Sequence, residues 1–492
     1  MRDVAGAERL KMTKARLDGL YLLLLGATVF VLLGTTLEHS APAPMSDFKA
    51  VYYGARLLIQ HTDPYKYGEI LRAYQADGGT FPSDPDISRS VRRSILVCIN
   101  LPVTLFLVSP FAMLPLVPAH MLWMTLMFGS IIFAAFLMWN LGANYAPAIS
   151  GLLIGFMLAN SEVLVIIGNS AGIVVSLCVI AVWCFLKPRF VLVGVLCLAI
   201  SLAAKPHDAG PVWLYFLLAG GVYRKRALQT LLVTLVLALP AVLLVSNVAP
   251  QWPQELHSNL LATSARGDLN DPGPTSMGAH TLGMIISLQT VVSVFRDDPR
   301  IYNPVTYLIC APPLLLWAFV TLRSRFSPER AWLALAAIAP LAMLPVYHRI
   351  YDAKLLMLTV PACAMLWAEG GLIGWLAPLL TAAGFVVTGD LPWVIFLSLI
   401  RTLHLPAAGT AGRMVASGLV FPVPLTLLAM GVFYLWVYVR RCSTLAVPAE
   451  SGSSEGVPIA PERLDSGIPL NSPFRKRIPS SCVFLNTVRG SR

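Results

Sequence analysis

The stretch LYLLLLGATVFVLL, residues 20–33, carries no charged side chain and follows a basic N-terminus. Comparable apolar stretches recur along the chain of 492 residues, which is 57% hydrophobic and 12% charged and has a mean hydropathy of +0.71. A soluble protein carries roughly a quarter charged residues. The composition therefore excludes a soluble multidomain enzyme and a disordered protein, and it predicts an all-α, polytopic membrane protein.

The apolar stretches predict about twelve transmembrane helices, together with shorter interfacial helices. The first is residues 20–33, and the segment before it, 1–19, contains five Lys and Arg residues. Because no convincing small-residue cleavage site follows, we interpret this region as a signal anchor with a cytoplasmic N-terminus. The other expected spans lie near residues 95–115, 119–140, 161–186, 190–204, 209–222, 227–247, 302–322, 329–346, 353–368, 370–388 and 417–439.

Counting crossings from a cytoplasmic N-terminus places the basic clusters of the short loops on the cytoplasmic side, as the positive-inside rule requires. Arg92 and Arg93 are the exception, and they lie in a long outer loop, where the rule is weaker. A short apolar piece at 147–160 is interpreted as re-entrant or as a half-helix, because a full span there would move the first basic cluster outside. The clusters are Lys187/Arg189, Arg224-Lys225-Arg226, Arg323/Arg325/Arg330 and Arg440-Arg441.

The domain organisation follows from this count. A transmembrane domain covers 20–440, with two large outer loops at 37–94 and 248–301. The segment 441–492 is rich in Ser, Pro and Gly and is predicted to be a disordered cytoplasmic tail.

Three shorter segments are expected to form helices that do not cross the membrane. Residues 46–60 have an amphipathic helical pattern, and residues 281–295 and 391–403 are too short to span comfortably. Such helices lie along the membrane interface.

The polar, titratable residues converge on one predicted face. Seven histidines (39, 61, 207, 257, 280, 348 and 404) map to the outer side, and only His120 maps to the inner side. A transporter more often carries such residues near mid-bilayer, on broken helices of repeated halves. The distribution favours an extracytoplasmic active site over a permeation path.

The chain carries no pattern typical of a soluble cofactor site. The eight cysteines lie in predicted spans or in the tail, and neither a CxxC pair, a Walker A loop nor a GxGxxG between strand and helix occurs. We therefore expect no cofactor and assign no metal ligand. Two neighbouring outer carboxylates could hold a divalent cation, which the sequence leaves open.

Asp47 is the first candidate for a catalytic residue. It opens the amphipathic segment soon after the first span, which would hold its carboxylate near the outer membrane surface. An aspartate at a helix start can be an N-cap whose oxygen accepts backbone N–H groups. The alternative is a general base that removes a proton from an acceptor hydroxyl.

Four stretches, taken in order, resemble glycosyltransferase family 87. SDFKAVYYGARLLIQHTDPYKY at 46–67 is similar to the outer-loop motif of the family, and GNSAG at 168–172 to its Gly-Gln-x-Asn element. SLAAKPHDAG at 201–210 resembles its Leu-Lys-Pro-Gln element, and YHRIYDAKLLML at 347–358 its late His/Tyr/Asp element. The resemblance covers roughly residues 20–440.

The chain departs from the family pattern at three positions. Asn169 and His207 each stand where Gln is usual, and Ala171 stands where Asn is usual. These departures leave the identity of the donor open.

The resemblance implies a GT-C type integral-membrane glycosyltransferase. Members transfer a sugar, often mannose, from a polyprenyl phosphate to a lipid-linked or glycan acceptor, with inversion. Asp47 would be the base, and Lys205, His348 and Arg266 would supply positive charge to the phosphate. Since sugar nucleotides are absent outside the cytoplasmic membrane, an outer site independently calls for a lipid-borne donor.

Each of these residues also has a plainer interpretation. Lys205 could be a lysine that snorkels to the interface, and His348 could be merely solvated or a cap. If His348 instead contacts the substrate, Asp352 could orient it, since i and i+4 share a helix face. Asn169, after Gly168, either marks only a kink or hydrogen-bonds to sugar or phosphate at an unwound span.

Two further candidates complete the predicted substrate site. Tyr53 is either an aromatic residue of the interfacial belt or a surface for sugar stacking, and His207 is placed there by its position in the family motif. The stretch RGDLNDPGPTSMGAH at 266–280 is either a turn-rich loop or a lid over the site.

The sequence therefore predicts an inverting hexosyltransferase at the outer face of the cytoplasmic membrane, with both termini cytoplasmic. Its expected partners are a polyprenyl-phosphate sugar, a lipid-linked or glycan acceptor and membrane lipid, but no nucleic acid. The alternatives are a lipid or polysaccharide transporter, and a polymerase or ligase of lipid-linked glycans. The acceptor, the linkage and the oligomeric state are not readable from the sequence.

Overall fold

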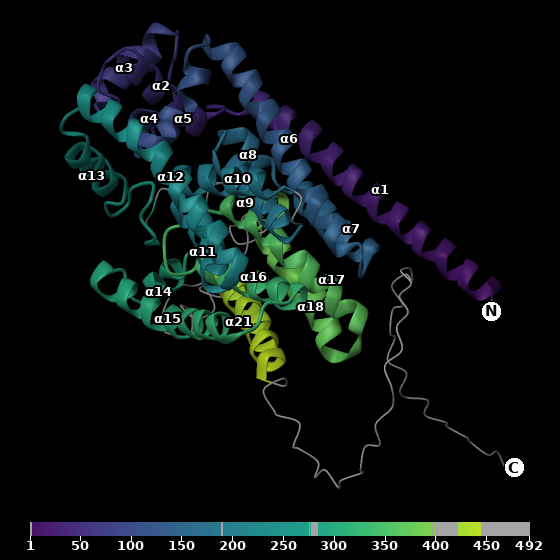
Figure 1. The fold of residues 1–492 in the computed structure, drawn as a ribbon. Coiled ribbons are helices and arrows are strands. Elements are labelled where there is room, and N and C mark those ends of the chain that lie inside the picture. Colours follow the sequence, from purple (N-terminus) through teal and green to yellow (C-terminus); the bar gives the residue numbers. More distant parts are fainter. Residues whose placement is uncertain are drawn as a thin grey trace, which may run out of the picture. The chain divides into compact units, whose positions relative to one another are not determined.

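The computed structural model describes residues 2–187, 190–274, 276, 284–392, 394–395, 398 and 422–443, with side chains from residue 13 onward. Within these ranges the chain forms helices and one isolated β-bridge, and no strand (Figure 1). The helices are α1 (Arg2–Ser40), α2 (Ser46–Ile59), α3 (Tyr67–Ala76), α4 (Pro85–Leu96), α5 (Pro102–Ala112), α6 (Leu116–Gly142), α7 (Pro147–Leu158), α8 (Glu162–Ile167), α9 (Ala171–Leu186), α10 (Val191–Ala204), α11 (Pro206–Leu218), α12 (Gly221–Val248), α13 (Trp252–Thr263), α14 (Gln289–Phe295), α15 (Pro299–Arg323), α16 (Pro328–Ala342), the 3-10 helix η1 (Asp352–Thr359), α17 (Val360–Glu369), α18 (Gly371–Val387) and α21 (Pro422–Ser443).

Among the described residues, six candidate spans are long and apolar enough to cross a membrane, as expected of a helical membrane protein. In α1, α12 and α15, less than a third of the apolar window is buried within the protein, as expected of surfaces that contact lipid. The predicted number of about twelve spans stays a prediction. The six are Thr13–Ser40, Leu116–Gly142, Pro147–Ile167, Gly221–Val248, Pro299–Arg323 and Pro422–Ser443.

The segment 147–160 forms the 12-residue helix α7, which ends at Leu158, and a break separates it from α8. By length and composition α7 and α8 together are one candidate span, Pro147–Ile167. The expectation of a re-entrant segment or half-helix stays a prediction.

The predicted span at 95–115 is wrong. Here α4 ends at Leu96, and α5 has only 11 residues, about half the thickness of a bilayer core. The Thr104 hydroxyl donates to the Ala204 carbonyl over 3.1 Å, and the Tyr52 hydroxyl donates to the Leu114 carbonyl over 2.8 Å. Both ends of α5 therefore lie near α2 and the end of α10, a region we call the site end. If 147–167 is counted as a span in place of 95–115, the number of crossings before Lys187 is the same, and Lys187 stays on the predicted cytoplasmic side.

His120 does not lie on the opposite side from the other histidines, as the sequence predicted. Its Nε2 atom is 3.3 Å from Glu38 Oε1, and the other Glu38 oxygen is 3.1 Å from His39 Nδ1. His39 and His120 therefore share one end of α1 and α6. This error follows from the predicted span at 95–115. Because α5 does not cross the membrane, α6 begins at the site end.

Among the described helices, α1 and α7 make the most extensive contact and lie along each other in Figure 1. The sequence GLLIG at 151–155 is a small-xxx-small motif, which lets two helix backbones approach closely. A Cβ atom added at Gly155 would overlap the backbone of Leu22, and one added at Gly26 would overlap Gly155. The Arg16 guanidinium also donates to Asn144 Oδ1 over 3.2 Å, which joins the N-terminal part of α1 to the turn before α7.

The expected amphipathic segment 46–60 is confirmed as α2. Within the described part of the expected helix at 281–295, α14 begins at Gln289, because residues 284–288 pair with another segment, described below. Most of 391–403 and the predicted tail beyond Ser443 lie outside the described residues.

Replacing Gly155 with Leu should destabilise the protein by separating α1 from α7, since inserting side-chain atoms into a packed interface costs about 1–3 kcal/mol or more. We expect thermal unfolding in detergent to begin several degrees below that of the wild type.

Gly129→Leu is the matched control, because Gly129 lies within α6 and a Cβ there meets nothing within 4 Å. Equal losses in both variants would contradict a close α1–α7 contact.

Candidate functional site

Asp47 is held by a side-chain hydrogen bond rather than acting as a helix cap. It is the second residue of α2, and no side-chain cap hydrogen bond is made at this helix start. Its Oδ2 atom accepts from Asn169 Nδ2 over 2.6 Å. Met45, in the left-handed region with φ 57°, donates its N–H to the Ile166 carbonyl over 2.7 Å and fixes the entry into α2. The N-cap interpretation of Asp47 is therefore wrong.

Asn169 lies in the break between α8 and α9, where the chain turns at Gly168. Gly168 has a φ of 67°, and a Cβ atom there would come within 2.7 Å of Met45 Sδ, so only glycine fits. Asn169 Oδ1 accepts from the Ala171 N–H over 2.8 Å and from Lys205 Nζ over 3.3 Å. At this break the Asn169 side-chain amide therefore binds both Asp47 and Lys205. Asn169 does more than mark a kink in the helix.

Lys205 is not a snorkelling lysine. It lies between α10 and α11, where Pro206 begins the next helix, and its side chain is only 15% exposed. Its ammonium donates to Asp352 Oδ1 over 2.9 Å and lies 3.6 Å from Asp208 Oδ2. It also lies 5.2 Å from the centroid of the Tyr351 ring. Lys205 is thus the centre of a buried polar network.

Asp352 begins η1 and closes the turn before it. Its Oδ2 atom accepts from the Arg349 N–H over 2.8 Å, while Oδ1 binds Lys205. The turn follows a short backbone pairing, in which Ile286 donates to the His348 carbonyl over 2.9 Å and Ile350 donates to the Met284 carbonyl over 3.0 Å. Because this pairing extends the chain at His348, the expected helical i, i+4 contact between His348 and Asp352 does not form.

His348 instead faces Asp208, which the sequence analysis did not select. His348 Nε2 is 3.4 Å from Asp208 Oδ1, and His207 Nε2 is 3.8 Å from the same oxygen. The two imidazole rings are 5.1 Å apart between centroids. His348 and Asp208 are each 1% exposed, whereas His207 is about one-third exposed. His207 therefore forms the outward side of this cluster.

Arg349 is a second buried cation that sequence reasoning missed. It is 6% exposed and its guanidinium donates to the Leu269 carbonyl over 2.8 Å and to Asn270 Oδ1 over 2.9 Å. Its Nε atom also binds the Tyr347 hydroxyl. Arg349 stands next to His348 in the quoted motif, so the sequence did contain a signal for it.

The electrostatics of the network follow from burial and from these charges. Burial raises the pKa of Asp47, against the lowering effects of the Asn169 hydrogen bond and of the Arg349 and Lys205 charges. Burial disfavours the charged form of Lys205, but Asp352 and Asp208 raise its pKa overall. Asp47 is therefore a carboxylate more basic than usual, close to firmly charged cations.

The charges act differently on the two histidines. Burial lowers the pKa of His207. Burial also opposes the charged form of His348, but the Asp208 carboxylate that faces its Nε2 atom raises its pKa.

The structure does not bring Arg266 or Tyr53 into this network. The Arg266 side chain is 73% exposed and pairs with Asp297 over 2.6 Å. Tyr53 is fully buried and packs edge-on against Tyr52 and Tyr74, with centroids 5.2 and 5.7 Å away. It therefore serves neither as a belt aromatic nor, in this conformation, as a surface for sugar.

The described part of the predicted loop 266–280 is ordered around Asp271. Its carboxylate accepts from the N–H groups of Gly267 and Gly273, over 2.8 and 2.9 Å. Because Leu269 and Asn270 bind Arg349, this turn-rich loop lies against the network. His280 lies outside the described residues.

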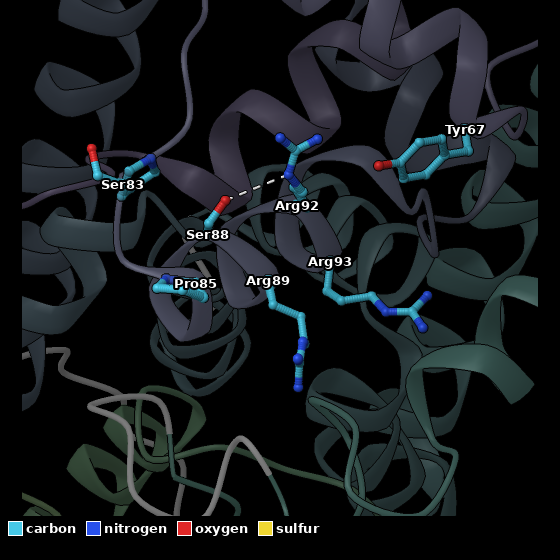
Figure 2. Close-up of a pocket in the computed structure, with 8 residues that line it drawn as sticks. Tyr67, Ser83, Pro85, Ser88, Arg89, Arg92 and Arg93 are labelled. Atoms are coloured by element: carbon cyan, nitrogen blue, oxygen red, sulfur yellow. Dashed lines mark hydrogen bonds between the residues drawn. The ribbon is translucent and has the colours of Figure 1, made fainter.

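A separate pocket of about 480 Å³ lies beside α4. Figure 2 shows Arg89, Arg92 and Arg93 around it, together with Ser88 and Tyr67. No carboxylate lines it, so its lining suits an anionic group. Arg93 pairs with Asp268 over 3.1 Å, which joins the pocket wall to the loop that binds Arg349.

Comparisons with known proteins add no assignment, since no protein-family model and no curated protein matches the chain.

Asp352→Asn should destabilise the protein strongly, because it leaves the buried Lys205 ammonium without its closest carboxylate. Breaking one side of a buried pair costs about 3–5 kcal/mol. The expected result is a clearly lower midpoint of thermal unfolding.

Asp297→Asn removes an aspartate from an exposed pair, which is worth about 0–1 kcal/mol, and should leave the midpoint nearly unchanged. If the two variants unfold alike, the network around Lys205 contributes little to stability.

Proposed function

We propose that the chain is an inverting glycosyltransferase that moves a sugar from a polyprenyl-phosphate donor to a lipid-linked or glycan acceptor. Mannose is the first sugar to test. As part of this proposal, the chain is a GT-C type enzyme of glycosyltransferase family 87. This assignment rests on the resemblance of four sequence motifs to those of the family. Three of these motifs contribute Asp47, Asn169 and Lys205, which hydrogen bonds join into one network.

One observation carries the proposal: a carboxylate with a raised pKa lies one amide side chain away from a buried ammonium. Asn169 donates to Asp47 and accepts from Lys205. Inverting transfer needs a base on the acceptor side and positive charge on the phosphate side. Asp47 and Lys205 meet those two needs, and Arg349 adds a second cation at the same site.

In the proposed reaction the acceptor hydroxyl oxygen attacks the anomeric carbon of the sugar, and Asp47 takes the hydroxyl proton. The bond between that carbon and the phosphate oxygen breaks with its electron pair, so polyprenyl phosphate leaves. Lys205 and Arg349 stabilise the charge that develops on the leaving phosphate. Inversion follows because the nucleophile and the leaving group occupy opposite faces of the sugar.

We assign the site end to the outer face of the cytoplasmic membrane. Helix α9 begins beside Asn169 and ends before Lys187, and α10 returns to Lys205. Arg441 pairs with Glu369, so the ends of α21 and α17 also meet away from the site end. Basic residues at the end opposite the site support a cytoplasmic location for that end.

Replacing Asp47 with Asn should abolish sugar transfer, with a fall of about 100-fold or more, because the amide cannot accept the proton. The measurement is transfer from radiolabelled polyprenyl-phosphate mannose in membranes that contain equal amounts of each protein.

Asp86→Asn is the matched control, since Asp86 is exposed in the first turn of α4 and should transfer label like the wild type. Equal transfer by the wild type and the Asp47 variant would remove Asp47 as the base. No transfer by the wild type, with mannose or with other polyprenyl-phosphate sugars, would favour a transporter.

The rate of transfer should depend on the ionisation of Asp47. Its carboxylate accepts a proton only when ionised, and burial raises its pKa above the ordinary 3.8. Activity should therefore be present above the raised pKa and lost as the pH falls through it, at a higher pH than for an ordinary aspartate. Asn169→Leu removes a hydrogen bond to the ionised form and should move this acidic limb upward. An unmoved limb would assign the titration to another group.

A further inference from the structure

The cluster of His207, Asp208 and His348 differs from an ordinary set of hydrogen bonds. Both Nε2 atoms face Asp208 Oδ1, at 3.4 and 3.8 Å. These distances exceed the usual 2.7–3.2 Å or so of an N–H···O hydrogen bond. They are close to the spacing of atoms that share one metal ion, since tetrahedral bonds of about 2.0–2.1 Å place ligand atoms about 3.3–3.4 Å apart.

The second nitrogen of His348 points to the same conclusion. His348 Nδ1 lies 3.2 Å from the Val346 carbonyl oxygen, which can only accept, so this nitrogen carries the proton. In the neutral form of His348, Nε2 therefore carries the lone pair and faces a carboxylate oxygen. This arrangement is stabilised either by a proton on Nε2 or by a cation between the two atoms. Metal-binding histidines commonly donate their other N–H to a backbone carbonyl in this way.

Asp208 and the charge of the whole network provide independent support. Asp208 Oδ2 is buried and has no hydrogen-bond partner among the described residues; its nearest cation is Lys205, at 3.6 Å. Three carboxylates (Asp47, Asp208 and Asp352) face two permanent cations (Lys205 and Arg349), which leaves one net negative charge when the histidines are neutral. A phosphate substrate would add more negative charge, and a divalent cation would offset it.

We propose that His207, Asp208 and His348 bind one divalent transition-metal ion. Two imidazoles and one carboxylate suit Zn²⁺, Mn²⁺, Fe²⁺ or Co²⁺ better than Mg²⁺ or Ca²⁺, which prefer oxygen ligands. The three ligand atoms lie within 4.8 Å of one another, and His207, about one-third exposed, is the ligand that would turn toward the ion. Three protein ligands leave a coordination position open, as in catalytic sites.

The role of the ion, unlike its binding, rests on the proposed function. The open position would bind an oxygen of the donor phosphate beside Lys205. The sequence showed no metal pattern because His207 and His348 belong to different motifs that only the fold brings together.

The test uses the purified full-length protein without a histidine tag, stripped with EDTA and titrated with Co²⁺ by visible absorption. We expect one Co²⁺ per chain and at least a tenfold weaker binding in His207→Ala and in Asp208→Asn. His257→Ala, which removes an exposed histidine on α13, should bind like the wild type. Unchanged binding in the His207 variant would place the ion elsewhere and overturn the proposal, as would the absence of stoichiometric binding of Co²⁺, Zn²⁺ and Mn²⁺.

A second measurement needs no variant. X-ray absorption of the Zn²⁺-loaded wild type should show two imidazole ligands and oxygen ligands, and a shell with sulfur or with oxygen alone would overturn the proposal. Failure of the metal site and failure of the proposed function are distinguishable. Binding without sugar transfer would leave the metal site standing, whereas transfer that persists with EDTA in a protein that binds no metal would leave only the transferase.

Discussion

The site depends on the hydrogen bonds that the Lys205 ammonium donates. It lies at a junction of α10 and α11 and reaches two other breaks, through Asn169 between α8 and α9 and through Asp352 at the start of η1. Each break exposes backbone polar groups, which near a membrane must find partners inside the protein. One buried cation thus holds together three interruptions of the helical structure, and the same geometry places Asp47 beside it.

A second lysine, Lys354, stabilises the segment η1 that carries Asp352. Lys354 is 2% exposed, and its ammonium donates to the carbonyls of Asn160 and Thr388 over 2.7 and 3.3 Å. Asp390, 3.9 Å away, accepts from the Val163 N–H over 2.7 Å. These contacts tie η1 to α8 and to the end of α18. Because η1 begins with Asp352, these contacts of Lys354 and Asp390 also fix the carboxylate that binds Lys205.

Much of the architecture was predictable from composition and periodicity, because long apolar stretches and amphipathic segments are local properties of the chain. The helix α2 and the convergence of polar residues are of this kind. The error at 95–115 arose because a short apolar segment lacked a decisive length. The glycines of GLLIG in α7 were a signal for a close helix contact that sequence reasoning did not use.

The site was predictable only in part, for a related reason. Asp47, Asn169 and Lys205 could be selected because each interrupts an apolar pattern or opens a segment. Asp208 could not be told from an ordinary residue of a helix start, since its role depends on His348, which reaches it from a distant segment. Arg266 shows the converse, because its charge and its place in a loop were suitable, yet it pairs with Asp297 at the surface. Residue type marks which side chains can do the chemistry, and the breaks between helices decide which of them meet.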